Sequence, residues 1–178
     1  NTYTTLSGAV GASYAFGDGI AIATNLSSGF RAPSIFELYA NGVHGGVAAF
    51  QVGNPDLDPE RSYSADLSLR VRRDRLTAEV TGYVNAIQNY IYLENTGEKG
   101  PNGNLPKFAA DQTDALIPGI EATVETSPLP WLQVGGSAAV LDGTGDGLGA
   151  DGGDGELPLL PSNTVSGFVR WVPADTGP

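Results

Sequence analysis

Cysteine and methionine are both absent from the 178 residues of this chain, and histidine occurs once. Without cysteine there is no disulfide framework, thiol nucleophile or thiolate metal site. The sequence has no G-x-S-x-G, H-E-x-x-H or phosphate-loop motif, and one histidine gives little support to a catalytic triad. A glycosidase would need two carboxylates at a defined separation, and the candidates for that role are Glu79, Glu121 and Glu125. A polar barrel interior would explain these glutamates without catalysis, so the sequence predicts no enzyme.

Charge is also scarce, since charged residues make up 16% of the chain against about 25% in soluble domains. The formal net charge is −11, which argues against nucleic-acid binding because phosphates are neutralised by basic residues. No run of about 18 apolar residues is present, which excludes an ordinary transmembrane helix. The chain could still span a membrane with β-strands, because a barrel strand needs only about 9 to 11 residues of alternating polarity.

A strict alternation of apolar and polar side chains is the strongest pattern in the sequence. In the segment 63–72, one face holds Tyr63, Ala65, Leu67, Leu69 and Val71, and the other holds Ser64, Asp66, Ser68, Arg70 and Arg72. A period of two indicates a β-strand rather than a helix. The same period recurs in 3–16, 76–86, 120–125, 132–140 and 163–172, and a further strand ends near residue 30. The sequence therefore predicts about seven strands and an all-β fold.

The connections between these strands alternate strictly in length. Short turns rich in Gly, Asp or Pro fall near 17–19, 73–75 and 127–131, whereas the connections 32–61, 94–114 and 142–161 are long. Every second reversal therefore lies on the same side of the sheet. This order is typical of an antiparallel up-and-down transmembrane β-barrel, with short periplasmic turns and long extracellular loops.

A barrel of this kind faces lipid on one side and a polar lumen on the other. The residues predicted to point to lipid are Leu67, Leu69, Val80, Val84, Ile120, Val134 and Val169. Those predicted to point to the lumen are Asp66, Arg70, Glu79, Glu121 and Glu125. Two aromatic girdles are also expected, with Phe16, Trp131 and Trp171 near the short turns and Tyr90 and Tyr92 near the long connections. A passive porin, an adhesin barrel and a soluble β-sandwich binding module share parts of this pattern and stay open as alternatives.

The first long connection carries residues suited to shaping its base. Pro33 and Pro55 fix φ and remove backbone donors, and Asn54 before Pro55 favours a turn. Arg31 and Glu60 lie at similar heights on the two strands that flank the connection, which predicts an ion pair. We interpret these five residues as a structural motif at the loop base.

The same connection has aromatic and ionisable residues between glycines, nearer its expected tip. Glu37, Tyr39, His44 and Phe50 are the candidate ligand contacts, because such groups can reach toward a ligand from a mobile tip. A lone histidine makes a poor metal site, since zinc takes several protein ligands, and no metal site is predicted. The acidic glycine-rich segment 142–156 could bind calcium or bridge cations to lipopolysaccharide phosphates, but it lacks EF-hand spacing. A solvated acidic loop is the better interpretation.

The runs FRAPSIFEL and GNPDLDPERS, which flank this first connection, resemble the barrel signature of TonB-dependent outer-membrane receptors. Weaker matches are GYVNAIQNYIYL at 82–93 and LPLLPSNTVSGFVRW at 157–171. The resemblance implies an active transporter of the outer membrane that imports a scarce nutrient such as an iron siderophore, haem, cobalamin or a metal chelate. It also implies membrane lipid and lipopolysaccharide as surroundings, no cofactor, and energy coupling to the TonB complex through a plug domain.

Seven strands fall well short of the 22 in that family, and even the smallest single-chain barrels have eight. We therefore expect residues 1–178 to be a partial receptor β-barrel domain, taken from the C-terminal barrel portion, with the plug domain absent from this chain. The resemblance does not determine which substrate the parent protein carries.

Overall fold

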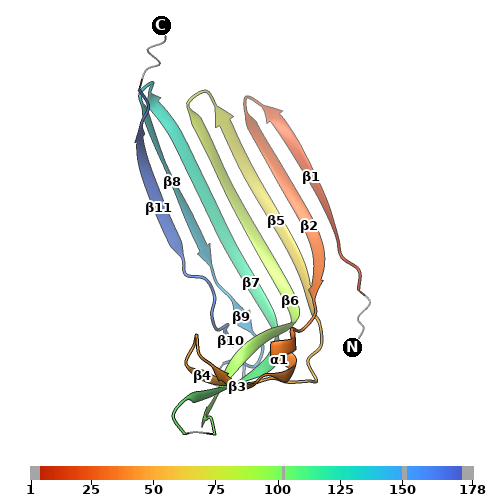
Figure 1. Cartoon of the computed structure of the whole chain (residues 1–178). Helices are drawn as coiled ribbons and strands as arrows, with labels where there is room; N and C mark the ends of the chain where they lie inside the picture. Colours follow the sequence, from red (N-terminus) through yellow and green to blue (C-terminus); the bar gives the residue numbers. More distant parts are fainter. Residues whose placement is uncertain (1–4, 102, 150–151, 174–178) are drawn as a thin grey trace.

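A computed structural model describes residues 5–101, 103–149 and 152–173, which form one curved, mainly antiparallel sheet (Figure 1). Its seven long strands are β1 (Gly8–Gly17), β2 (Ile20–Arg31), β5 (Glu60–Arg73), β6 (Leu76–Lys99), β7 (Pro106–Leu129), β8 (Leu132–Leu141) and β11 (Thr164–Trp171). Each of these strands is antiparallel to the next along the chain. The predicted all-β, up-and-down order is confirmed, and the sheet is open because β1 and β11 each pair with one strand among the described residues.

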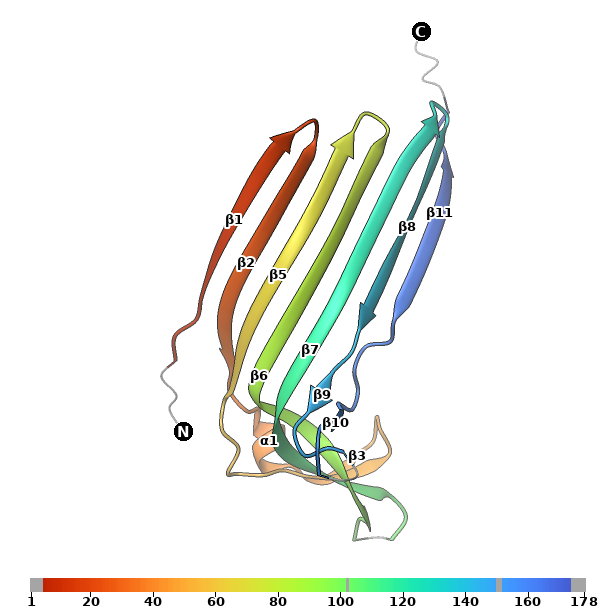
Figure 2. The same cartoon turned by 180° about the vertical axis from the view of Figure 1, so that it is seen from behind.

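The three short turns lie together at one end of the sheet and the long connections lie at the other (Figures 1 and 2). In the turn between β1 and β2, Asp18 and Gly19 have φ values of 49° and 74°. Two successive positive φ values characterise the hairpin turn whose twist matches that of the flanking strands. A Cβ at Gly19 would overlap the carbonyl oxygen of Arg72. Glycine is therefore required at this position for both conformation and space.

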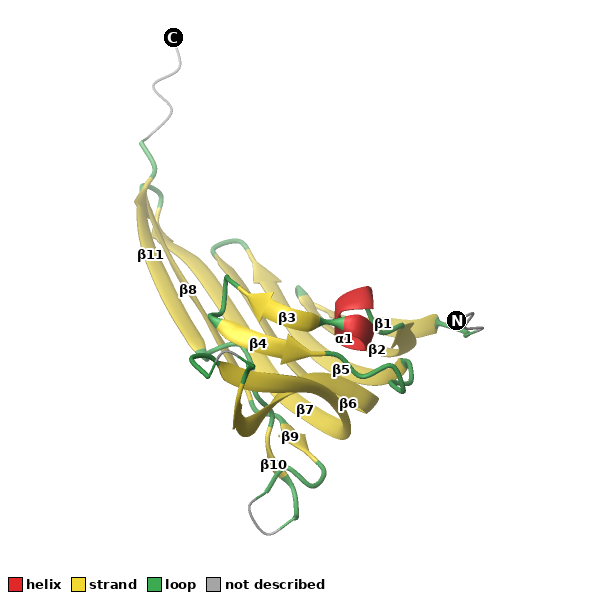
Figure 3. Ribbon diagram, turned by 60° about the horizontal axis from the view of Figure 1, so that its bottom comes forward, coloured by secondary structure: helices red, strands yellow, loops and turns green. Residues whose placement is uncertain are grey.

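The long connections contain structure that the alternation does not predict. Their described residues form four short strands, namely β3 (Asn41–His44), β4 (Ala49–Val52), β9 (Thr144–Gly145) and β10 (Gly155–Glu156), together with one helix, α1 (Ile35–Tyr39). The expected loop 94–114 is wrong, because β6 and β7 stay paired as far as Lys99 and Pro106. Figure 3 shows β3 and β4 beside the extended ends of β6 and β7, and β4 pairs with β7 in parallel.

The two faces of the sheet differ in polarity as predicted. On one face Leu67 and Ile120 have exposed side chains, at 59% and 51%, and the register places apolar residues opposite each other, as in the Leu69–Val80 pair. This apolar face is not covered by a second sheet within the described residues, because all of their strands belong to a single sheet. The β-sandwich alternative is therefore wrong. Among the described residues, no helix is long and apolar enough to cross a membrane.

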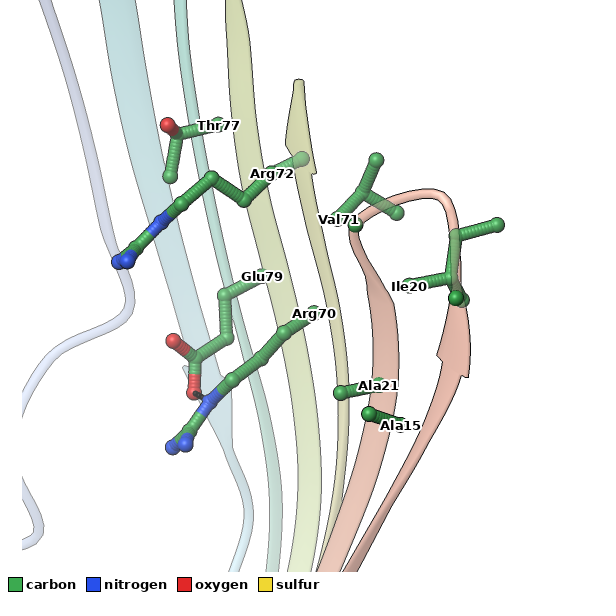
Figure 4. Close-up of a pocket in the computed structure, with 11 residues that line it drawn as sticks. Ala15, Ile20, Ala21, Arg70, Val71, Arg72, Thr77 and Glu79 are labelled. Carbon is green, nitrogen blue, oxygen red and sulfur yellow. Dashed lines mark hydrogen bonds and ion pairs between the residues drawn. The ribbon is translucent and has the colours of Figure 1, made fainter. Parts of the chain in front are cut away.

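The opposite face carries a continuous set of polar contacts between neighbouring strands. Ser68 is buried and its hydroxyl lies 2.8 Å from that of Thr81, while Arg70 and Glu79 form an ion pair of 2.9 Å. Figure 4 shows Arg70, Glu79 and Arg72 reaching away from the sheet on the same side. Cross-strand pairs of this kind fix the register of adjacent strands.

The aromatic prediction holds at one end of the sheet and fails at the other. Trp131 and Trp171 are exposed beside the short turns. Near the long connections, an irregularity interrupts the register between Ile87 and Tyr90, where Asn89 has a φ of 55°. The extra residue in β6 puts the Tyr90 side chain on the same face of the sheet as Ile87, which is the face opposite to the apolar one. Tyr90, and Tyr92 two residues further along the strand, therefore lie off the apolar face, and the predicted girdle at this end is wrong.

Candidate functional site at the long connections

The first long connection begins with a compact helical turn rather than an open loop. Ser34 is the N-cap of α1, and its hydroxyl accepts a hydrogen bond of 3.2 Å from the backbone N–H of Glu37. In return the Glu37 carboxylate accepts a bond of 2.6 Å from the Ser34 N–H. This reciprocal pair is a capping box, which satisfies two backbone donors that a helix start leaves free. It turns the Glu37 side chain back toward the preceding strand.

Arg31, the last residue of β2, lies between two carboxylates. Its Nε and Nη2 atoms donate to both oxygens of Glu60, at 2.7 and 2.6 Å, and its Nη1 donates to Glu37 at 2.9 Å. The predicted ion pair between Arg31 and Glu60 is therefore present, in the two-bond geometry that suits guanidinium and carboxylate. The placement of Glu37 near the loop tip is wrong, because the capping box directs its carboxylate to Arg31 at the loop base.

Glu60 also accepts a hydrogen bond from the backbone of β6, besides its contact with Arg31. It is buried, and its Oε1 accepts a hydrogen bond of 2.8 Å from the backbone N–H of Ile91 in β6. The β5–β6 pairing ends at Arg61 and Gln88, so beyond it the Glu60 side chain takes the place of a strand partner for this N–H. One carboxylate thus joins β2, β5 and β6 where the first connection begins and ends.

Hydrogen bonds also lower the pKa of the Glu37 carboxyl group. Burial acts to raise it, but the backbone and side-chain bonds from Ser34 and the contact with Arg31 outweigh burial and take the pKa below its usual 4.5. Glu37 is therefore ionised near neutral pH, where the charge strengthens its bonds to Arg31 and to the start of α1.

The returning half of the connection is held by the residues after β4. The Asn54 N–H donates to the carbonyl of Glu37 at 2.8 Å, and its side-chain oxygen accepts from the Asp56 N–H at 3.0 Å. The second bond closes the local turn that Asn before Pro favours. Pro33 is buried and Pro55 is exposed. Both ends of the connection are thereby joined to each other through the helix.

A small hydrophobic core lies beneath this motif. It consists of the buried side chains of Leu38, Leu57, Ile91 and Ala110, with Leu93 packed against it. Leu38 and Leu57 come from the first connection, and Ile91, Leu93 and Ala110 come from the extended β6–β7 hairpin. The core therefore fastens the first connection to that hairpin.

Sequence reasoning missed one polar brace that completes this arrangement. The side chain of Gln112 in β7 accepts from the Asp58 N–H at 2.8 Å, donates to the Asp58 carbonyl at 2.7 Å, and donates to the Asn89 carbonyl at 2.9 Å. A glutamine 54 residues away from its partner has no local sequence signal. The Ser34–Glu37 capping box did have one, the S-x-x-E spacing before an apolar residue.

The other candidate contacts lie apart from the base. Tyr39 and His44 are exposed, whereas Phe50 is half-buried, and a Cβ at Gly100 would lie 2.6 Å from the Phe50 Cβ. Phe50 therefore packs closely on the turn between β6 and β7. Their role as ligand contacts remains a prediction.

No cation site is evident in the described part of the chain. Its residues contain no group of three or more His, Cys, Asp or Glu side chains arranged to hold a metal. In the acidic segment 142–156, Asp142 accepts from the Gly143 N–H at 2.8 Å, and Asp151 lies outside the described residues. Calcium binding by this segment stays an untested alternative.

Among the clefts formed by the described residues, two lie at opposite ends of the sheet. The cleft at the short-turn end has a volume of about 360 Å³, and its lining includes Arg70, Arg72, Thr77 and Glu79 (Figure 4). At the other end, a cleft of about 210 Å³ is lined by Val47, Ala49, Gln51, Leu93, Phe108, Pro158 and Leu159. The first and third long connections and the extended β6–β7 hairpin all contribute to the second cleft, which is mostly apolar.

An open, single-layer sheet with one apolar and one polar face, short turns at one end and structured connections at the other, is a section of an up-and-down transmembrane β-barrel. Across residues 1–178 the chain matches the family "TonB dependent receptor-like, beta-barrel". The chain belongs to this family, which comprises receptors and not enzymes.

Similar proteins include transporters of different cargoes. The chain is 29% identical over 102 residues to the vitamin B12 transporter BtuB of Photobacterium profundum, covering 57% of this chain and 15% of the relative. It is 27% identical over 128 residues to the ferric enterobactin receptor PirA of Pseudomonas aeruginosa, covering 64% and 17%. The copper transporter OprC superposes with a TM-score of 0.76 at 23% identity, covering 95% of this chain and 25% of that structure. The chain thus spans a quarter or less of these three proteins.

Proposed function

We propose that the parent protein is an active transporter of the bacterial outer membrane that imports a scarce nutrient, such as an iron siderophore, haem, cobalamin or a metal chelate. The observation that carries this proposal is the match of the whole chain to the receptor barrel family. The relatives bear names that refer to vitamin B12 and ferric enterobactin, which supports cargo of this kind. Experiment must decide which of these nutrients the parent protein imports.

The two faces of the sheet support a membrane setting. Leu67, Ile120 and Val169 lie on the apolar face and are exposed, as expected of side chains in contact with lipid. In the proposed orientation the short turns face the periplasm and the long connections reach outward through the lipopolysaccharide. The polar face with Arg70 and Glu79 then lines the lumen.

Residues 1–178 act as one section of the barrel wall in this proposal. Coupling to the TonB complex requires a plug domain, which we assign to another part of the parent protein. This section of the wall carries the first long connection, residues 32–59, at its outer end. Arg31, Glu37 and Glu60 hold the base of this connection, and Tyr39, His44 and Phe50 are the proposed ligand contacts. Because its carboxylate is already bonded to Arg31 and Ser34, Glu37 supports the base rather than contacting ligand.

Growth of a host strain tests the proposal. Strains with and without the parent gene are compared under iron, zinc, copper and cobalamin limitation, each in a background with and without TonB. We expect growth on one nutrient to require both the gene and TonB. A porin would instead give TonB-independent growth and a passive ion conductance for the purified protein in planar bilayers, and that result would refute active transport.

A further inference from the structure

We propose that the turn between β5 and β6 binds the phosphate group of an anionic phospholipid in the periplasmic leaflet, through the guanidinium groups of Arg73 and Arg75. The site lies on the outer surface of the barrel wall, at the level of the lipid head groups. This inference rests on the membrane setting of the proposed function and adds a defined lipid contact to it.

The position of Arg73 follows from the alternation along β5. Arg70 and Arg72 lie on the polar face, and Val71 points to the opposite side of the sheet (Figure 4). Arg73 comes two residues after Val71 and pairs with Leu76 in the strand register, so it lies on the apolar face, because alternate residues of a strand share a face. An arginine on a lipid-facing surface is costly unless its charged group reaches the head groups. This places the Arg73 guanidinium beside lipid phosphate.

Two arginines mark the ends of the apolar face of β5. They are Arg61 and Arg73, and the residues of this face between them are uncharged, namely Tyr63, Ala65, Leu67, Leu69 and Val71. The interval between the two arginines, residues 62–72, has the length of a strand that crosses the hydrocarbon core, about 9 to 11 residues. Trp131 and Trp171 are exposed at the same end as Arg73, and tryptophan is enriched at the head-group level. Arg73 therefore lies at the boundary of the periplasmic leaflet.

The arginines around this turn have free guanidinium groups. Within the described part of the chain, Arg72, Arg73 and Arg75 form no ion pair and no side-chain hydrogen bond. The backbone of the turn is nevertheless fixed, because the Arg75 carbonyl accepts hydrogen bonds of 2.9 Å from the Thr126 hydroxyl and the Ser127 N–H. A guanidinium without a partner, on a fixed backbone, is suited to bind a phosphate group through two parallel hydrogen bonds.

The same three arginines line another cleft at the short-turn end, with a volume of about 660 Å³. Leu76 and Thr126, which pair with each other on the apolar face, also line it, so the cleft reaches the lipid side of the wall. Asp18 and Asp74 line it too, but the three guanidinium groups outnumber the two carboxylates, and the cleft keeps a net positive charge. A phospholipid offers an anionic phosphate to the cleft and acyl chains to the apolar face, whereas a free anion offers the first alone. The site therefore favours a lipid.

Native mass spectrometry of the complete receptor in detergent measures this contact as the dissociation constant of the first bound lipid. Phosphatidylglycerol is the anionic probe, phosphatidylcholine is the zwitterionic probe, and inorganic phosphate is added as a competing free anion. The variants are Arg73→Gln, the same change combined with Arg75→Gln, and Arg70→Gln as the matched control. Arg70 lies on the same strand and at the same end, but it faces the lumen, pairs with Glu79 and does not line this cleft.

We expect phosphatidylglycerol to bind more tightly than phosphatidylcholine. Arg73→Gln should weaken phosphatidylglycerol binding about fivefold, because an arginine near a membrane surface contributes about 1 kcal/mol. The double substitution should weaken it about 25-fold, and Arg70→Gln should leave it unchanged. Equal effects of Arg70→Gln and Arg73→Gln would overturn the inference, because they would show a response to net charge alone. Equal binding of the two lipids, or displacement of phosphatidylglycerol by inorganic phosphate at the same concentration, would also overturn it.

A second measurement distinguishes failure of the lipid site from failure of the proposed function. Leu67→Cys is placed in a complete receptor without other cysteines, reconstituted in lipid vesicles and reacted with a water-soluble maleimide. Protection of this cysteine, together with weaker phosphatidylglycerol binding in Arg73→Gln, supports the inference. Protection without any effect of Arg73→Gln would overturn the lipid site and leave the membrane setting and the import function intact, whereas rapid labelling would refute the membrane setting itself.

Discussion

Replacement of Glu60 by alanine should loosen the entire first long connection while leaving the barrel wall folded. The substitution removes the acceptor of the Ile91 N–H and both bonds from Arg31. A buried backbone N–H without a partner costs about 1 to 3 kcal/mol. Arg31 is 45% exposed and keeps its bonds to Glu37, so water replaces part of what it loses, and the loss there is about 1 kcal/mol. The expected total is about 2 to 4 kcal/mol of local stability.

Amide hydrogen exchange of the complete receptor in detergent measures this directly, because a local opening free energy converts to an exchange rate. A loss of about 2 to 4 kcal/mol corresponds to about 30-fold to several hundredfold faster exchange across residues 32–59, since about 1.4 kcal/mol is tenfold. The wall strands β5 and β7 should exchange as before. Glu37→Gln is the matched control, because its carboxylate is more exposed and leaves Ile91 untouched, and it should change exchange only a few-fold.

Unchanged exchange in the Glu60→Ala receptor would refute the reasoning. It would mean that the hydrophobic core of Leu38, Leu57, Ile91 and Ala110 holds the first connection in place without the buried Glu60 carboxylate. Faster exchange confined to residues near Ile91 would show that the N–H contact matters and the ion pair does not.

Three further predictions follow from the wall and the loop base. Leu67→Arg on the apolar face should destabilise the inserted barrel by about 2 to 4 kcal/mol, measured by urea unfolding in lipid vesicles, and an effect near zero would contradict lipid contact. Gly119→Ala should destabilise the wall because an added Cβ would overlap the ring of Tyr83, and the same change in a Tyr83→Ala background should cost much less. Because the Glu37 pKa is lowered, its contribution to loop stability is present above about pH 4.5 and lost as the pH falls through the lowered value. Protease resistance of the first connection should therefore fall in that acidic window, and the fall should be smaller in Glu37→Gln.

The period of two was enough to predict the wall, because a strand with lipid on one face and polar groups on the other must alternate. It could not predict where β6 and β7 end. The segment after Asn95 contains Gly97, Gly100 and two prolines within the stretch to Pro106, which reads as a loop, yet contacts with β4 and Phe50 keep the hairpin paired. Long-range packing overrides local propensity in such segments.

The base of the candidate site was partly predictable for a similar reason. Arg31 and Glu60 are adjacent in the strand register, so their pairing follows from topology alone. The position of Glu37 depended on a helical turn of five residues, which its capping box signals but hydrophobic periodicity does not. The cleft could not be predicted, since Val47, Phe108 and Leu159 come together only through the packing of two long connections against the extended β6–β7 hairpin.

The length of the β6–β7 hairpin determines which described part of the chain lies farthest from the membrane in the proposed orientation. Each strand contains 24 residues, about 80 Å along its path, whereas about 9 to 11 residues cross the hydrocarbon core. In the proposed orientation more than half of the hairpin stands outside the lipid, and the described residues of its turn, 100–101 and 103–105, lie farthest from the short turns (Figure 1). An antibody or a bacteriophage tail that approaches the cell therefore meets this turn first among the described parts of the chain, which makes it the natural position for an epitope tag.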